Sequence, residues 1–164
     1  FYHTSKNEIG NILIKVIEIE GPIHIEEARR RVIQHWKMNN VKSTIRLIMR
    51  DVEKLCCETG RILKKGDFLW PPKMDRVKIR YRDIEGLTKK IELICPEEIE
   101  EAIKFILKKE FSMPCHDIIT QTAKILGFNR TGDTIYSSLS TIINNLLKKK
   151  MLLKQEDRLI LVEN

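Results

Sequence analysis

Residues 42–70 read KSTIRLIMRDVEKLCCETGRILKKGDFLW. The first part has apolar side chains at the three- and four-residue spacing that lines one face of a helix: Ile45, Ile48, Met49, Val52 and Cys56. Gly60 ends this pattern, and two short apolar runs follow at 61–63 and 68–70, with the turn signal Lys65-Gly66-Asp67 between them. The segment therefore predicts an amphipathic helix that leads into a tight β-hairpin.

The same pattern returns ninety residues later in the chain. The apolar positions of this second copy are Ile135, Leu139, Ile142, Leu146, Leu152 and Leu159. Upstream, the helical pattern that starts at Glu8 has its counterpart from Glu98, at the same offset. Few aligned residues are identical, so the repeat rests on the phase of the apolar positions. The sequence predicts a duplication.

Each copy predicts the order helix, helix, turn, helix, hairpin, which is the order of a winged helix. The predicted fold class is mainly α with small β-hairpins (α+β), as a tandem duplication of two winged-helix units, each a helix-turn-helix plus a wing. We expect a first unit at 1–75, beginning with a tail at 1–7, and a second at 97–164. Between them, 76–96 predicts an ordered connector with one or two short strands and a turn near 83–86.

The charge balance favours a polyanionic partner. The chain has 30 Lys and Arg against 23 Asp and Glu, a net charge of +7, and the excess lies toward its front. No apolar run approaches the ~20 residues that cross a bilayer, and no secretion signal opens the chain. We therefore expect a cytoplasmic protein without membrane contact, and because the first residue is Phe1 we expect a piece of a longer chain.

Catalytic and metal-binding motifs are absent from the sequence. The four cysteines lack zinc-site spacing and are expected to be small core side chains, and there is no phosphate-binding glycine loop. Cys115-His116-Asp117 combines a thiol, an imidazole and a carboxylate, but neighbouring residues at a helix start point in different directions. We expect no enzyme activity, no metal and no cofactor.

Four separated motifs resemble an uncharacterised domain family. They are Gly21–Glu27 with Arg29–Val32, Gly66–Pro72, Ile91–Ile99 and Gly127–Ile135. That family closes very large prokaryotic proteins that contain a superfamily 1 helicase core and a Vsr-like endonuclease domain. The resemblance implies a carboxy-terminal accessory domain of such a protein, with the upstream helicase and nuclease domains as partners. It brings no catalytic residues to this chain.

Residues on the outer face of the predicted helix 43–59 are the first candidates for nucleic-acid binding. Arg46, Arg50 and Lys54 follow one another at four-residue spacing and form one basic stripe, which suits phosphates or guanine edges. The full set in this unit is Lys42, Ser43, Thr44, Arg46, Arg50 and Lys54 on the helix and Lys64 and Lys65 at the wing. Two alternatives stay open: a solvated face whose charges pair with Asp51 and Glu53, and phosphate contacts by Arg29–Arg31.

The corresponding helix of the second unit has a face rich in hydroxyl groups and nearly without charge. Its candidates are Arg130, Thr131, Thr134, Tyr136, Ser137, Ser140 and Thr141. Hydroxyls can bind bases, but without cations they add little electrostatic affinity. The preferred hypothesis is a module that binds nucleic acid, with duplex or junction DNA favoured. The alternative is a protein interaction module that docks on its own helicase core or forms a homodimer.

Overall fold

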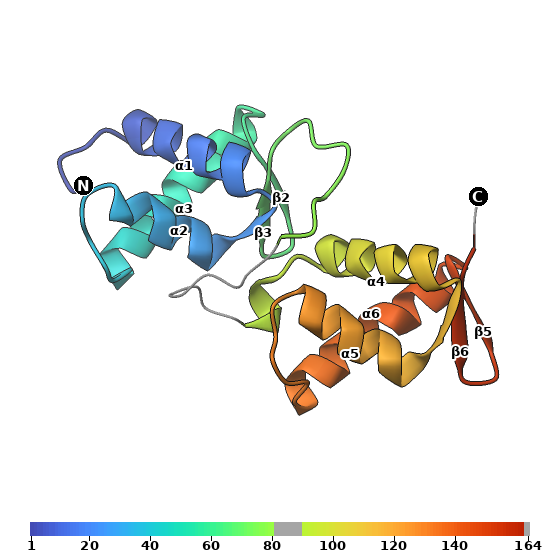
Figure 1. The fold of residues 1–164 in the computed structure, drawn as a ribbon. Coiled ribbons are helices and arrows are strands. Elements are labelled where there is room, and N and C mark those ends of the chain that lie inside the picture. Colours follow the sequence, from blue (N-terminus) through green and yellow to red (C-terminus); the bar gives the residue numbers. More distant parts are fainter. Residues whose placement is uncertain (81–89, 163–164) are drawn as a thin grey trace. The chain divides into compact units, whose positions relative to one another are not determined.

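The computed structural model describes residues 1–80 and 90–162 and has a mixed α+β fold (Figure 1). Over these residues there are six α-helices and two three-stranded antiparallel sheets. The chain divides into two compact units, Phe1–Arg76 and Val77–Asn164. In Figure 1 the sheet of each unit lies at one end of its three helices. None of the described helices is long and apolar enough to cross a membrane.

The first unit packs three helices around one apolar core. Its elements are α1 (Lys6–Glu20), β1 (Ile23–His24), α2 (Ile25–Gln34), α3 (Ser43–Glu58), β2 (Leu63–Lys65) and β3 (Phe68–Trp70). The strands pair in the order β1-β3-β2, with Ile23 opposite Leu69 and Lys65 opposite Phe68. The core takes one face of every helix, because the apolar positions recur with the helical period.

The start of the chain differs from the predicted tail. Helix α1 begins at Lys6, and Ser5 caps it: Ser5 Oγ accepts from the backbone N–H of Glu8, whose carboxylate accepts in turn from the backbone N–H of Ser5. The ring of Phe1 packs edge-to-face on Trp36, with the ring centroids 5.2 Å apart. Residues 1–5 are therefore part of the first unit.

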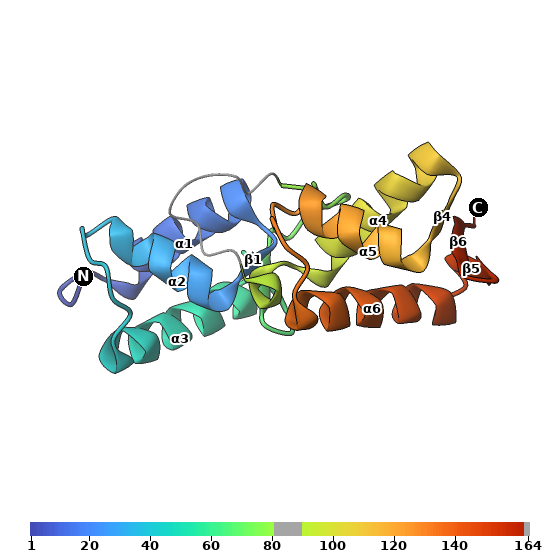
Figure 2. The same ribbon diagram turned by 60° about the horizontal axis from the view of Figure 1, so that its bottom comes forward.

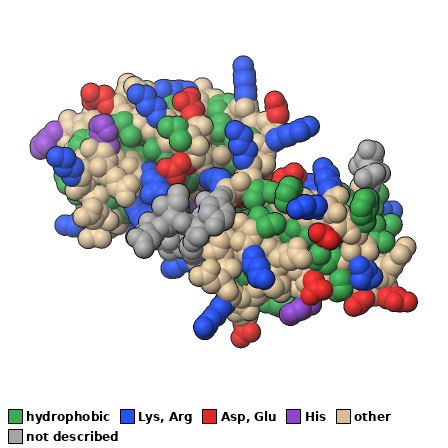
Figure 3. Space-filling view, in the orientation of Figure 1, with side chains coloured by type: hydrophobic (Ala, Val, Ile, Leu, Met, Phe, Trp, Pro, Cys, Tyr) green, Lys and Arg blue, Asp and Glu red, His purple; other side chains and the backbone are tan. Residues whose placement is uncertain are grey.

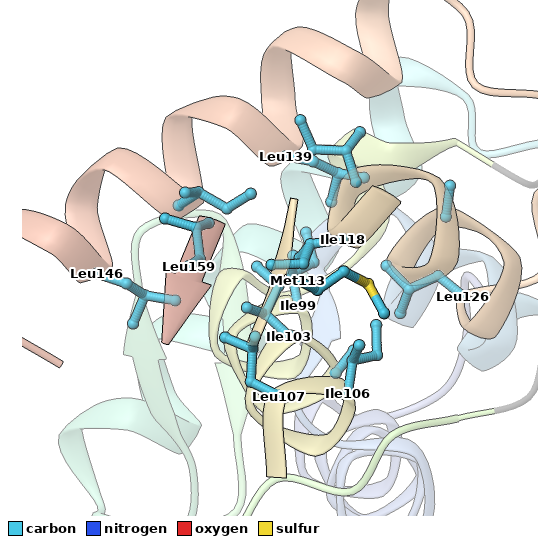
Figure 4. Close-up of a cluster of buried hydrophobic side chains, with 14 of the residues drawn as sticks. Ile99, Ile103, Ile106, Leu107, Met113, Ile118, Leu126, Leu139, Leu146 and Leu159 are labelled. Atoms are coloured by element: carbon cyan, nitrogen blue, oxygen red, sulfur yellow. The ribbon is translucent and has the colours of Figure 1, made fainter. Parts of the chain in front are cut away.

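The second unit is built from the same kinds of element in the same order. They are α4 (Pro96–Glu110), β4 (Ser112–Pro114), α5 (Cys115–Ile125), α6 (Asp133–Lys148), β5 (Leu152–Gln155) and β6 (Arg158–Leu161), with the sheet order β4-β6-β5. Figure 4 shows Leu139 and Leu146 of α6 and Leu159 of β6 in the same cluster as Ile103 and Ile118.

Elements of the two units correspond at an offset of 90 residues. Helices α4 and α6 begin and end 90 positions after α1 and α3. Backbone positions with positive φ correspond too: Lys37 with Gly127, Gly60 with Lys150, and Gly66 with Glu156. These are turn positions, where a left-handed residue lets the chain reverse. These three turns thus correspond between the units, whereas the turn after the first helix does not, because Phe111 has φ of +60° and Gly21 has φ of −72°.

The described part of the connector packs on the second unit. Ile79 contacts its core, and the backbone N–H of Arg80 donates to the fully buried carboxylate of Glu98 at 2.8 Å, while Arg80 Nη2 donates to it at 2.7 Å. Ile91–Leu93 forms a 3₁₀ helix where the sequence predicted a second short strand, and 77–80 is not a strand. The turn predicted near 83–86 lies outside the described residues.

Candidate nucleic-acid interface

Helix α3 turns one face to the core and the opposite face to solvent. Ile45, Met49 and Val52 are fully buried. Figure 2 shows α3 on one side of its unit, with α1 and α2 on the other. The predicted contact residues on this helix are all exposed: Lys42, Ser43, Thr44, Arg46, Arg50 and Lys54. No side chain caps the amino end of α3 at Lys42, and its first turn contains no acidic residue, so no carboxylate of α3 itself offsets the positive end of the helix dipole there.

Arg46 is held in place by a carboxylate on α2. Its Nη2 donates to Glu26 Oε2 at 2.8 Å, and its Nε donates to the same oxygen at 3.3 Å. Burial opposes ionisation of Glu26, but the hydrogen bond and charge of Arg46, followed by those of Arg29, outweigh it and lower the pKa of this carboxyl. A phosphate that binds Arg46 would therefore compete with, or share the guanidinium with, Glu26.

Each arginine of the predicted cluster Arg29–Arg31 is paired within the unit. Arg29 is buried and donates to both oxygens of Glu53, at 2.7 and 2.8 Å. Arg30 pairs with Glu27 at 2.6 Å, and Arg31 pairs with Glu20 at 2.9 Å. Glu53, expected to neutralise the α3 surface, is instead buried with Arg29.

The other cations of α3 are weakly neutralised. Arg50 has no ion pair among the residues described, and Lys54 Nζ lies 3.7 Å from Glu58, with both side chains largely exposed. Asp51 on the same helix pairs with Lys6 at 2.7 Å, and the hydrogen bond from Lys6 lowers its pKa. Figure 3 draws the side of the first unit on which α1 and α2 lie in front of α3, and acidic side chains stand between the basic ones on that side.

The hairpin of the first unit meets the start of α2. The backbone N–H of Ile25 donates to the carbonyl of Asp67 in the hairpin turn at 2.9 Å. Glu26, the next residue, holds Arg46. The first turn of α2 therefore contacts both the hairpin turn and the α3 surface. Lys64 and Lys65 are exposed on β2, and Lys65 Nζ lies 4.0 Å from the centroid of the Trp70 ring, a cation–π contact.

Helix α6 presents several hydroxyl groups, and two of them donate their protons to backbone carbonyls of the same helix. Ser137 Oγ donates to the carbonyl of Thr134 at 3.0 Å, and Thr141 Oγ1 donates to that of Ser137 at 2.9 Å. The predicted residues Arg130, Thr134, Tyr136, Ser137 and Thr141 are exposed, whereas Thr131 and Ser140 are half-buried. Arg158 on the hairpin is tied to Ser112, donating to its carbonyl at 2.7 Å. Two of the hydroxyl protons on this surface are therefore engaged by the helix backbone, while Arg130, Thr134 and Tyr136 are exposed.

Two residues at these surfaces were not among the predicted ones. Glu26 restrains Arg46 from twenty positions away, and His116 contacts Tyr136 from the same distance along the chain. Sequence spacing alone does not bring α2 next to α3. The offset of 90 residues relates the two pairs to each other, because His116 and Tyr136 lie ninety positions after Glu26 and Arg46.

The cysteines and histidines form no metal-binding group in the described part of the chain. Burial raises the pKa of the Cys115 thiol, and the charge of Lys154 opposes that rise. Burial, followed by the hydrogen bond to Glu97, raises the pKa of Cys95 to about 12. Such thiols stay protonated at neutral pH and are poor nucleophiles.

One segment of the chain is similar to a known protein family. Residues 1–46 match a family described as a protein of unknown function (DUF3320). The match covers α1, β1, α2 and the first residues of α3. No curated protein and no solved structure matches the chain. The front of the first unit is thus similar to an uncharacterised family.

Proposed function

We propose that the chain is a non-catalytic module that binds nucleic acid, with duplex or junction DNA favoured, and that it consists of two duplicated winged-helix units. The order of elements, the sheet order and the 90-residue offset support this assignment. In the family that the chain resembles, such a module forms the carboxy-terminal part of a helicase and nuclease protein.

The exposed face of α3 is the observation that carries the proposal. Arg46, Arg50 and Lys54 follow one another at four-residue spacing, just over one helical turn, and face solvent, while the core face of α3 is buried. Duplex DNA admits a helix in its major groove, where arginine and lysine reach guanine edges and phosphates. Lys64 and Lys65 on the hairpin supply contacts to the flanking backbone, as a wing does.

Affinity should depend steeply on salt. We expect about three to five phosphate contacts, each adding about 0.9 to the negative slope of log affinity against log salt. The test is the fluorescence anisotropy of a labelled mixed-sequence duplex titrated with the whole chain at several salt concentrations. Arg46→Glu combined with Arg50→Glu should abolish binding, and Arg50→Glu alone should weaken it and reduce the slope.

A matched control comes from α1. Lys15 is an exposed helical cation without an ion pair among the described residues, as is Arg50, so Lys15→Glu makes the same change of charge elsewhere in the first unit. It should leave affinity nearly unchanged. If Lys15→Glu and Arg50→Glu lose the same affinity for the duplex, the interaction depends only on net charge and α3 is rejected as the contact surface. Undiminished binding by the variant with both Arg46→Glu and Arg50→Glu would also reject it.

A second function, docking on another protein, is favoured by exposed apolar side chains of the second unit. Phe105 is 53% exposed, Phe111 is 80% exposed and Leu153 is 52% exposed. Phe111 also has φ of +60°, a backbone conformation that bulky residues rarely adopt. Light scattering after size exclusion, and capture of the helicase core by the chain, test this function. A monomer that captures no helicase core would argue against it.

A further inference from the structure

The two units differ where α2 meets α3 and α5 meets α6. In the first unit Glu26 and Arg46 form an ion pair at 2.8 Å. At the positions ninety residues later stand His116 and Tyr136, whose ring centroids lie 6.2 Å apart with the ring planes inclined by 39°. His116 is exposed and Tyr136 is 42% exposed. An ionic pair at this place is thus replaced by an exposed aromatic pair.

The residues that anchor the ion pair have changed in the same way. Glu26 is also held by Arg29, which is buried against Glu53. The counterparts of Arg29 and Glu53 are Ile119 and Ile143, both in the apolar core of the second unit. A neutral aromatic pair needs no buried charge to hold it, so the four substitutions form one consistent change of surface chemistry.

The exposed rings stand beside hydroxyl groups of α6 that are engaged within the helix. The hydroxyl protons of Ser137 and Thr141 are donated to backbone carbonyls of α6 and are not free to read base edges. Two cations of the second unit are exposed: Arg130, three residues before α6, and Lys154 on β5, whose charge acts on Cys115, the residue before His116. Aromatic faces with cations nearby are how proteins hold unpaired bases.

We propose that His116 and Tyr136 form a stacking platform for an unpaired base, so that the second unit binds single-stranded nucleic acid. This inference rests on the proposed function and narrows it. The first unit holds a duplex through phosphates, and the second binds an unpaired strand. The preferred substrate is then a duplex that continues into a single-stranded tail, such as a helicase produces.

The test compares a blunt duplex with the same duplex carrying a long single-stranded tail. The wild-type chain should bind the tailed duplex more tightly. Tyr136→Ala should lose roughly five-fold or more on the tailed duplex and nothing on the blunt one. Tyr136→Phe keeps the ring and should bind as the wild type does. Phe105→Ala removes a comparably exposed aromatic from α4 of the same unit and should have no effect.

A crosslink tests the contact without any substitution. A tail with 5-iodouracil should crosslink on irradiation to the tryptic peptide 131–148, in which Tyr136 is the sole aromatic residue. Three outcomes would overturn the platform and leave the duplex-binding function standing. They are equal affinity of the wild-type chain for both substrates, an equal loss of affinity on both substrates in Tyr136→Ala, and a crosslink confined to other peptides. Failure of the wild-type chain to bind either substrate would overturn both.

Discussion

Arg29 and Glu53 form a two-point ion pair inside the first unit. Arg29 Nε lies 2.7 Å from Glu53 Oε1 and Nη2 lies 2.8 Å from Oε2, and both side chains are less than a tenth exposed. Arg29 Nη1 also donates to Glu26 at 2.8 Å, and Glu26 in turn holds Arg46. A chain of four charged groups therefore runs from the core to the exposed face of α3.

Removing one member of the buried pair should destabilise the first unit strongly. Glu53→Gln leaves the buried Arg29 with only the half-exposed Glu26 as a counter-charge, and breaking a buried ion pair in this way costs about 3–5 kcal/mol. Both tryptophans of the chain, Trp36 and Trp70, lie in the first unit, so tryptophan fluorescence during urea unfolding reports this unit alone.

The matched variant copies the second unit. Arg29→Ile combined with Glu53→Ile places in the first unit the residues found ninety positions later, and it should be less destabilising than Glu53→Gln, because no charge is left buried. A double variant that is as unstable as the single one would show that the ion pair is required for more than its own charge balance.

Releasing Arg46 should strengthen nucleic-acid binding. Glu26→Gln removes the carboxylate that competes with phosphate for Arg46, so affinity for duplex DNA should rise and the salt slope should steepen by about one unit. Glu27→Gln is the control, because Glu27 pairs with Arg30 of α2 and not with a cation of α3. A lower affinity in Glu26→Gln would mean that Glu26 orients Arg46 for binding and does not compete.

The pairing of Glu26 should also make the first unit sensitive to acid. The pKa of Glu26 is lowered in the folded chain, so its interactions stabilise the fold above the unfolded pKa, near 4.5, and are lost as pH falls through the folded pKa. In urea unfolding followed by fluorescence, the wild type should exceed Glu26→Gln in stability at neutral pH. The difference in stability between the two should shrink below pH 4.5. A difference that stays constant with pH would contradict a stabilising role of the Glu26 charge.

Cys95 should resist alkylation in the folded chain. It is fully buried, its Sγ donates to Glu97 at 2.6 Å, and its pKa is raised to about 12, so almost no thiolate is present near pH 8. Peptide mapping after timed exposure to iodoacetamide should show Cys95 labelled only on unfolding and the half-buried Cys57 labelled earlier. Equal labelling rates in the folded chain would contradict the buried position.

Local patterns predicted most of the helices and both hairpins. The apolar period places α3 and α6, and Gly66 places the first hairpin turn, because these signals act over a few residues. The early start of α1 was readable too: Ser5 and Glu8 have the spacing of a capping box. The packing of Phe1 on Trp36 was not readable, because it joins residues far apart in the chain.

The candidate surfaces were predictable in position but less so in chemistry. The helical period separates the exposed from the buried residues of α3, except that Glu53, expected at the surface, is buried with Arg29. The restraint of Arg46 by Glu26 and the pairing of His116 with Tyr136 depend on how the helices pack. Charge partners of this kind require the three-dimensional arrangement.

The most direct test of the central claim is a map of the backbone amide signals of the chain, recorded by NMR with and without a short DNA duplex. The account predicts that the signals which shift cluster at residues 42–54 of the first unit and at the hairpin turn 64–67. Shifts confined to α1 and α4, or no shifts at low salt, would contradict the assignment of α3 as the surface that grips the duplex.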